Sequence, residues 1–153
     1  MPLEFRGPFL LLFAVDSQLG TLLQTTMREC PLTPEEFAVT SALNLSGPVR
    51  AGELARLTGL RPTSMSNYLR RFEERSIVRR RTDPMDRRAT LVSLTARGKR
   101  ETVACFPAFQ RAIDGFQKAL ADEGVHEADL LDALEGASRA LATTQAMVEG
   151  KDE

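Results

Sequence analysis

The chain has 153 residues, a formal net charge of −1 and 27% charged side chains, values typical of a single globular domain with a hydrophobic core. Two cysteines and one histidine are too few for a disulfide scaffold or a zinc finger, so we expect a cytoplasmic protein without metal or cofactor. The only apolar run, residues 9–15, is far shorter than the roughly 20 residues that cross a bilayer, and no membrane association is expected.

Residues 8–28 predict a first helix with an excess of apolar surface. Its start is apolar nearly all round, and Leu19, Leu22, Leu23 and Met27 continue the pattern. A helix that faces solvent on one side does not need this much apolar surface. We therefore expect it to be buried partly in the domain and partly against a second subunit, with burial in the core alone as the alternative.

A capping box predicts the start of the second helix. Thr33 is the expected N-cap, Pro34 suits the first turn, and Glu36 lies three residues after the cap. The helix is expected over 34–45, before the breaking sequence at 46–48. Its predicted inward face consists of Phe37, Ala38, Ser41 and Leu45.

The first part of residues 50–98 contains two short helical patterns joined by a tight turn. Gly59 is suited to the left-handed position that ends the first helix, and Pro62 is suited to the first turn of the second. The predicted inward residues are Leu54, Ala55 and Leu57 in the first helix, and Met65, Leu69 and Phe72 in the second. A pattern of this kind indicates a helix-turn-helix.

Two β-branched runs at 77–82 and 89–94 follow, and the turn-forming sequence 83–88 separates them. They predict a β-hairpin with arginines at its tip, which together with the preceding helices makes a winged helix-turn-helix. Residues 50–100 hold 14 basic and 5 acidic side chains, a net charge of +9, while the remainder of the chain carries −10. This segregation provides the positive field that a polyanion requires, and a merely solvated charged surface does not account for it.

Two further amphipathic helices are expected after the hairpin. Thr95 is a candidate N-cap for the first, which contains Pro107 and an apolar stripe at Phe106, Phe109, Ile113, Phe116 and Leu120. Residues 122–124 break it, and a last helix is expected over 127–148 with repeated leucines. The helices at both chain ends have more apolar surface than a small winged domain can cover, which favours a two-fold homodimer.

The chain resembles the MarR family of bacterial transcriptional regulators. The resemblance is carried by GELARLTGL at 52–60, TSMSNYLRRFEERSIVRR at 63–80 and, above all, DPMDRRATLVSLTARG at 83–98. It implies a mainly α fold with a small β-hairpin wing, in which 33–98 form the DNA-binding lobe and 8–28 and 99–149 form dimerisation helices of one domain spanning 1–153. The implied function is a homodimeric repressor of transcription, released by a ligand, that binds a pseudo-palindromic operator in double-stranded DNA.

The outward residues of this lobe are the candidate DNA contacts. Side chains near the start of the second helix of the motif reach base edges in the major groove, and the candidates are Thr63, Ser64, Ser66 and Asn67. The candidate phosphate contacts are Arg50, Arg61, Arg70 and Arg71. Arg87 and Arg88 at the wing tip are candidates for the minor groove. The resemblance favours Arg88 as the inserted residue, braced by Asp86.

Four positions depart from the family pattern. Asn67 stands where many members carry Arg or Lys, so the DNA sequence recognised should differ. Ser76 replaces the usual glycine, at an energetic cost if its φ is positive. Arg50 and Arg61 occupy positions where Ser or Thr usually caps a helix, so they forgo capping and add charge beside helix N-termini.

The resemblance also implies an effector pocket near the dimer interface. Its expected lining is Met27, Arg28, Phe37, Phe106 and Phe109. An apolar lining with one arginine suits an aromatic or lipophilic carboxylate, and the alternative is that these side chains simply fill the core. Of the two cysteines, Cys30 is the candidate for an oxidant-sensing thiol, because Arg28 lies two positions before it and a nearby positive charge favours the thiolate. Whether the protein senses oxidants is left open by the sequence.

Nothing in the sequence indicates an enzyme. His126 is the only imidazole, the carboxylates are scattered over helix surfaces, and there is no phosphate-binding glycine loop or metal-ligand set. A protein-interaction module that kept this fold and lost DNA binding is the alternative function. The net charge of +9 argues against it, because such a module has little reason to retain the wing arginines.

Overall fold

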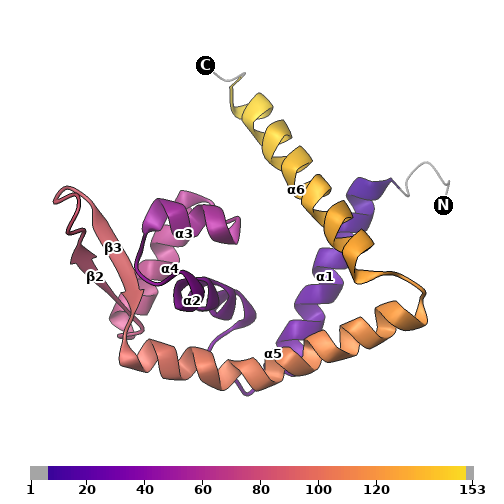
Figure 1. Ribbon diagram of the computed structural model, residues 1–153, viewed down its shortest axis with the longest axis horizontal. Coiled ribbons are helices and arrows are strands. Elements are labelled where there is room, and N and C mark those ends of the chain that lie inside the picture. The colour runs from indigo at the N-terminus through magenta and orange to yellow at the C-terminus, as the bar shows by residue number, and fades with distance from the viewer. Residues whose placement is uncertain (1–6, 151–153) are drawn as a thin grey trace. The chain divides into compact units, whose positions relative to one another are not determined.

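The computed structural model describes residues 7–150, in which six helices and three short strands are formed (Figure 1). Two compact units divide this part of the chain, one ending at Ala112 and the other beginning at Ile113. In chain order the elements are α1 (Pro8–Thr26), α2 (Pro34–Ser46), β1 (Val49–Arg50), α3 (Ala51–Thr58), α4 (Pro62–Glu74), β2 (Val78–Thr82), β3 (Thr90–Leu94), α5 (Ala96–Asp122) and α6 (Glu127–Glu149). The predicted mainly α fold with a small β wing is confirmed.

Helix α2 begins at the predicted capping box. The Thr33 Oγ1 accepts a hydrogen bond from the Glu36 N–H at 3.2 Å, and the Glu36 carboxylate accepts one from the Thr33 N–H at 3.3 Å. The predicted inward face was only partly right, since Leu45 is 84% exposed. The residues of α2 that are buried are Glu36, Phe37, Val39, Thr40 and Leu43. Helix α2 contacts both α3 and β3, so two of its sides are covered rather than a single stripe.

Helices α3 and α4 form the predicted helix-turn-helix. Gly59 ends α3 in the left-handed conformation, with φ 67° and ψ 10°, and Pro62 opens α4. Leu54 and Ala55 of α3 are buried as expected, but Leu57 is 55% exposed. The stripe of α4 is confirmed throughout, because Met65, Leu69 and Phe72 are each at most 1% exposed. This stripe fixes the opposite side of α4 as its outward face.

The wing is an antiparallel hairpin of β2 and β3, with Val78 opposite Leu94 and Thr82 opposite Thr90. A third strand, β1, pairs with the other edge of β3 and places Val49 opposite Val92 and Arg50 opposite Leu91. Strand β1 was not predicted from the sequence, because two residues are too few to show the alternation of a strand. The strand anchors the wing to the residue from which α3 begins.

The junction between the wing and α5 explains the sequence Leu-Thr-x-x-Gly. The Thr95 Oγ1 accepts a hydrogen bond from the Gly98 N–H at 3.0 Å, which confirms the predicted N-cap, and donates to the Ser76 carbonyl at 2.7 Å. A Cβ on Gly98 would lie 2.1 Å from the Ile77 carbonyl oxygen. Ser76 has φ 56°, the only positive φ of a non-glycine residue among those described. The strain anticipated at this position is therefore present.

Helix α5 continues through Pro107, and its buried residues are mostly small: Gly98, Thr102, Cys105, Ala108 and Ala112. The aromatic stripe predicted for α5 is offset from this buried face, and Phe106 is 38% exposed and Phe116 is 50% exposed. Small side chains allow α5 to approach the winged lobe closely.

The chain ends carry the surplus of apolar surface that the sequence indicated. Gly124, with φ 70°, ends the break that precedes α6. No residue of α1 or α6 is buried. Exposed apolar side chains include Phe9 at 61% and Phe13 at 63% in α1, and Leu131 at 56% and Met147 at 63% in α6. Apolar surface on this scale is typical of helices that are covered by another chain.

Candidate nucleic-acid interface

The outward face of α4 presents short polar side chains at its N-terminal end. Thr63, Ser66 and Asn67 are exposed, and Ser64 is half-buried. Pro62 supplies the first turn, and the buried stripe through Met65 holds the helix against the core, so these four side chains project from a rigid element. Short hydroxyl and amide groups at this end of a helix are suited to hydrogen bonds with base edges in a major groove.

The arginines of this helix differ in their environment. Arg61 is exposed at the N-cap position and makes no side-chain cap. Arg70 forms an ion pair with Glu74 at 3.1 Å, so its charge is partly offset. The guanidinium of Arg71 lies 4.7 Å from the centre of the Tyr68 ring, and that ring packs on Phe72. Tyr68 was not predicted to have a role, although its position one turn before Arg71 allows a cation–π contact.

The tip of the wing is held by two aspartates and leaves its arginines outward. The Asp83 carboxylate accepts a hydrogen bond from the Met85 N–H at 2.9 Å, and the Asp86 carboxylate accepts one from the Arg88 N–H at 3.0 Å. Asp86 thus braces Arg88 through its backbone. Arg87 and Arg88 are exposed, and neither forms an ion pair with any residue that the structure describes.

Arg50 lies beside the N-terminus of α3, as expected, but its side chain turns to the wing. One guanidinium nitrogen, Nη2, lies 2.9 Å from Asp83 and 3.2 Å from Asp86. The hydrogen bond from Arg50 lowers the pKa of the Asp83 carboxyl below its ordinary value, and the same bond raises the pKa of Arg50. The charge that sequence analysis assigned to phosphate binding is therefore shared with two carboxylates.

Strand β2 adds three consecutive arginines for which sequence analysis gave no individual role. Arg79, Arg80 and Arg81 are all exposed. Arg80 forms an ion pair with Glu73 at 2.7 Å, and the Arg79 Nε donates to the Ser93 Oγ at 3.4 Å. Arg81 forms no ion pair within residues 7–150, so it is a further free positive charge on the wing. A basic run inside a predicted edge strand was the signal that pointed to it.

Arg75 ties the end of α4 to the rest of the lobe. Its guanidinium donates to the buried Glu36 carboxylate at 2.7 Å and to the Pro31 carbonyl at 3.1 Å, and it lies 3.7 Å from Glu101. Glu36 is at the same time the glutamate of the capping box. The Glu36 carboxylate thereby joins the first turn of α2 to the C-terminal end of α4. This link limits movement of α4 within the lobe.

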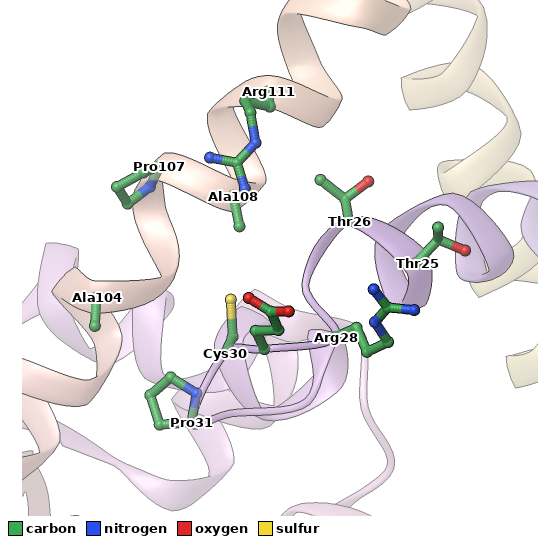
Figure 2. Close-up of a pocket in the computed structure, with 10 residues that line it drawn as sticks. Thr25, Thr26, Arg28, Cys30, Pro31, Ala104, Pro107, Ala108 and Arg111 are labelled. Atoms are coloured by element: carbon green, nitrogen blue, oxygen red, sulfur yellow. The ribbon is translucent and has the colours of Figure 1, made fainter.

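Two cavities lie near the expected effector pocket. The first, of about 450 Å³, is called here the arginine cavity, and Figure 2 shows Arg111 reaching from α5 toward the α1–α2 connection that carries Arg28 and Cys30. It is lined by Thr25, Thr26, Arg28, Glu29, Cys30, Pro31, Ala104, Pro107, Ala108 and Arg111. The second, of about 480 Å³, includes Met27, Arg28 and Arg75. Of the predicted lining, Arg28 contributes to both cavities and Met27 to the second.

The three predicted phenylalanines line neither cavity. Phe37 is 2% exposed, with its ring centre 5.3 Å from that of Phe106 and 5.0 Å from that of Phe109. Phe37 belongs to the core and Phe109 packs against it partly buried, whereas Phe106 contacts Phe37 but is 38% exposed. Arg111, which sequence analysis did not single out, takes part instead. A basic residue on an apolar helix five positions from Phe106 was its only signal in the sequence.

Both cysteines are free thiols near the arginine cavity. Cys105 is buried, its Sγ lies 3.3 Å from the Glu101 carbonyl, and burial raises the pKa of its thiol to about 11. Cys30 is half-buried. A thiol with so high a pKa reacts slowly with oxidants at neutral pH, so Cys105 is unsuited to initiate oxidant sensing.

No group of three or more histidine, cysteine, aspartate or glutamate side chains within residues 7–150 is arranged to hold a metal ion. None of the helices in the same range combines the length and apolar character that crossing a bilayer demands.

Comparison with known proteins identifies the same lobe. A family model described as the MarR family matches residues 31–89. The HTH-type transcriptional regulator YcgE of Bacillus subtilis is 38% identical over 77 residues, which are 50% of each chain. A second regulator from that organism, YwaE, is 29% identical over 75 residues, 49% of this chain and 44% of the other. The chain matches about half the length of these curated relatives.

Solved structures extend the likeness to nearly the whole fold. The PcaV transcriptional regulator from Streptomyces coelicolor, in complex with its natural ligand, has a TM-score of 0.72 at 22% identity and covers 94% of this chain and 96% of its own. The transcriptional repressor CouR, bound to a 23-mer DNA duplex, has a TM-score of 0.68 at 22% identity and covers 86% and 89%. Identities this low establish the fold alone. Residues 31–89 are thus similar to the MarR family, and the fold is that of the winged helix-turn-helix transcriptional regulators among the solved structures.

Proposed function

We propose that this chain is a cytoplasmic, homodimeric regulator that binds a pseudo-palindromic site in double-stranded DNA and represses transcription until a small ligand releases it. The observation that carries the proposal is the position of the unpaired positive charge. The net charge of +9 falls on the winged helix-turn-helix, and Arg61, Arg87 and Arg88 are exposed there without an ion-pair partner in the described chain. A protein that neutralises phosphates needs such charge free on its surface.

The contacts divide by role. Thr63, Ser64, Ser66 and Asn67 lie at the outward N-terminal end of α4 and are proposed to meet base edges, with Asn67 able to bond adenine through both atoms of its amide. Arg61, Arg70 and Arg71 are proposed to meet phosphates, and Arg70 must exchange Glu74 for the phosphate. The wing tip is proposed to enter the minor groove through Arg88.

A second copy of the chain is the proposed cover for the apolar helices at its ends. Phe9 and Phe13 of α1 and Leu131 and Met147 of α6 are each more than half exposed, which a monomer in water does not favour. In such a dimer the two α4 helices are expected one turn of DNA apart, roughly 34–36 Å.

The arginine cavity is the proposed effector site. Arg28 and Arg111 approach it from two elements, and Ala104, Pro107 and Ala108 supply an apolar wall, which suits an aromatic or lipophilic carboxylate. Such a ligand acts only if it binds one spacing of the two winged lobes more tightly than another. PcaV, which has a similar fold, was solved with its natural ligand.

The test of DNA binding is a salt titration with a duplex selected by the chain from a random pool. Arg88→Ala should weaken binding strongly and flatten the plot of log affinity against log salt by about one unit, because one phosphate-proximal charge is lost. The matched control is Arg139→Ala on α6, which removes an exposed arginine paired with Glu135 and should leave the slope unchanged. If the unmodified chain selects no duplex, the protein-interaction alternative is favoured.

The dimer and the effector are tested separately. Sedimentation equilibrium at micromolar concentration should give twice the chain mass, and a monomer that still binds DNA one-to-one contradicts the proposed assembly. A screen of aromatic acids should find compounds that raise the melting temperature and release DNA together, and Arg111→Ala should weaken both effects. Compounds that stabilise the protein without releasing DNA contradict ligand control.

A further inference from the structure

The Arg50 side chain joins the start of α3 to the tip of the wing. Its backbone is fixed on one side by the pairing of β1 with β3, where Arg50 lies opposite Leu91, and on the other by the start of α3. Its Nη2 lies 2.9 Å from the Asp83 carboxylate and 3.2 Å from that of Asp86. The two partners are 33 and 36 residues further along the chain. Arg50 is therefore a bridge from a rigid anchor to the wing turn.

The two carboxylates that Arg50 holds are themselves the frame of that turn. The second oxygen of Asp83 accepts from the Met85 N–H at 2.9 Å, and the second oxygen of Asp86 accepts from the Arg88 N–H at 3.0 Å. The Asp83 N–H donates to the Ala89 carbonyl at 2.9 Å, which closes the turn at its base. Each aspartate uses one oxygen for the backbone and the other for Arg50. The Asp86 carboxylate thus connects the Arg50 guanidinium directly to the backbone N–H of Arg88.

Electrostatics argues against a direct phosphate contact for Arg50. The cluster of one arginine and two aspartates has a net charge of −1, so as a whole it repels a phosphate. Releasing Arg50 to DNA would also leave Asp83, whose residue is only 8% exposed, without its charged partner. An unpaired carboxylate in that position is costly. The cluster is therefore unsuited to bind a phosphate. What its hydrogen bonds do is hold the conformation of the turn 83–88.

We propose that Arg50 is a positioning residue for DNA recognition, which holds the turn 83–88 through Asp83 and Asp86 so that the wing arginines are presented in one arrangement. The inference rests on the proposed DNA-binding function and revises the role that sequence analysis gave to Arg50. Ordering the tip before binding reduces the conformational entropy lost on contact with DNA. Arg50 acts here through Arg88.

A pair of substitutions separates positioning from charge. Arg50→Ala removes the bridge, and Asp83→Asn removes the ion pair while its amide oxygen still accepts from the Met85 N–H. Simple electrostatics predicts that Asp83→Asn tightens DNA binding, because a negative charge is lost from the basic lobe. If Arg50 positions the wing turn, Asp83→Asn should instead weaken DNA binding. Arg56→Ala is the matched control, since it removes one exposed positive charge from α3 that forms no ion pair within residues 7–150.

The expected result is that Arg50→Ala and Asp83→Asn each weaken binding to the selected duplex by roughly three- to tenfold, in line with one or two partly exposed ion pairs. The salt slope of Arg50→Ala should match that of the unmodified chain. In an Arg88→Ala background, Arg50→Ala should change affinity by less than about twofold, because both act through one contact. Arg50→Lys should recover part of the affinity, since a single nitrogen makes both contacts.

Amide hydrogen exchange in the DNA-free protein provides a readout that does not depend on DNA binding. In Arg50→Ala the Met85 and Arg88 amides should exchange faster, and amides in the α4 core should not change. If the unmodified chain binds no DNA while these amides respond, the proposed function fails and the Arg50 bridge stands. Tighter binding by Asp83→Asn, a salt slope lowered by about one in Arg50→Ala, or unchanged amide exchange would each overturn the inference.

Discussion

Gly98 in α5 lies against the backbone of Ile77, the residue before β2, with no room for a side chain. A Cβ at this residue would lie 2.1 Å from the Ile77 carbonyl oxygen and 3.0 Å from the Ile77 carbonyl carbon. Both are backbone atoms, so no side-chain rotation relieves the clash. The oxygen also accepts a hydrogen bond from the Thr95 N–H at 2.9 Å, and the movement that makes room for a methyl group stretches that bond.

The magnitude for Gly98→Ala follows from three terms. Overpacking against a fixed neighbour costs about 1–3 kcal/mol. Weakening the Thr95 to Ile77 hydrogen bond costs about 0.5–1.5 kcal/mol. Alanine in a helix offsets this by up to about 1 kcal/mol. The free energy of unfolding should therefore fall by about 2 kcal/mol, which is a large part of the stability of a small domain.

Urea unfolding followed by circular dichroism, at one fixed protein concentration, measures this change. Gly115→Ala is the control in the same helix, because a Cβ there meets nothing within 4 Å. It should leave stability unchanged or raise it by about 0.5–1 kcal/mol. If Gly98→Ala is as stable as the unmodified chain, the close approach of α5 to Ile77 is wrong and the explanation of the Leu-Thr-x-x-Gly sequence fails with it.

Three further predictions concern stability. Ser76→Gly should raise the free energy of unfolding by about 0.5 kcal/mol or more, since relief of the positive φ outweighs the added chain entropy, and an unchanged urea midpoint would contradict the strain. Thr33→Ala should lower the free energy of unfolding by about 1 kcal/mol through loss of the capping box, whereas Thr33→Ser should keep most of the stabilisation from the cap. The lowered pKa of Asp83 stabilises the fold above the ordinary carboxyl value of 3.8, and this stabilisation is lost as the pH falls through the lower folded pKa. The difference in melting temperature between the unmodified chain and Asp83→Asn should accordingly shrink below about pH 3.8, and a difference that stays constant down to pH 2 would contradict the Asp83 to Arg50 pairing.

The sequence alone was sufficient where the determining interactions are short-range. The capping box at Thr33, the left-handed end at Gly59 and the first turn at Pro62 each depend on groups within about one helical turn. The hairpin was predictable for the same reason, since two short runs with β-branched residues flank a turn sequence. The segregation of positive charge into residues 50–100 needed no structure at all.

Only the tertiary structure decided which neighbour covers each element and which partner each charge takes. Leu45 had the periodicity of a core residue but is exposed, because α3 and β3 cover other sides of α2. Phe37 is buried in the core, and the cavity that Arg28 lines is also lined by Arg111. Arg50 and Asp83 are 33 residues apart, and no local pattern links them. Side-chain periodicity records which positions are apolar, whereas the identity of the covering element and of the ionic partner depends on how distant segments fold together.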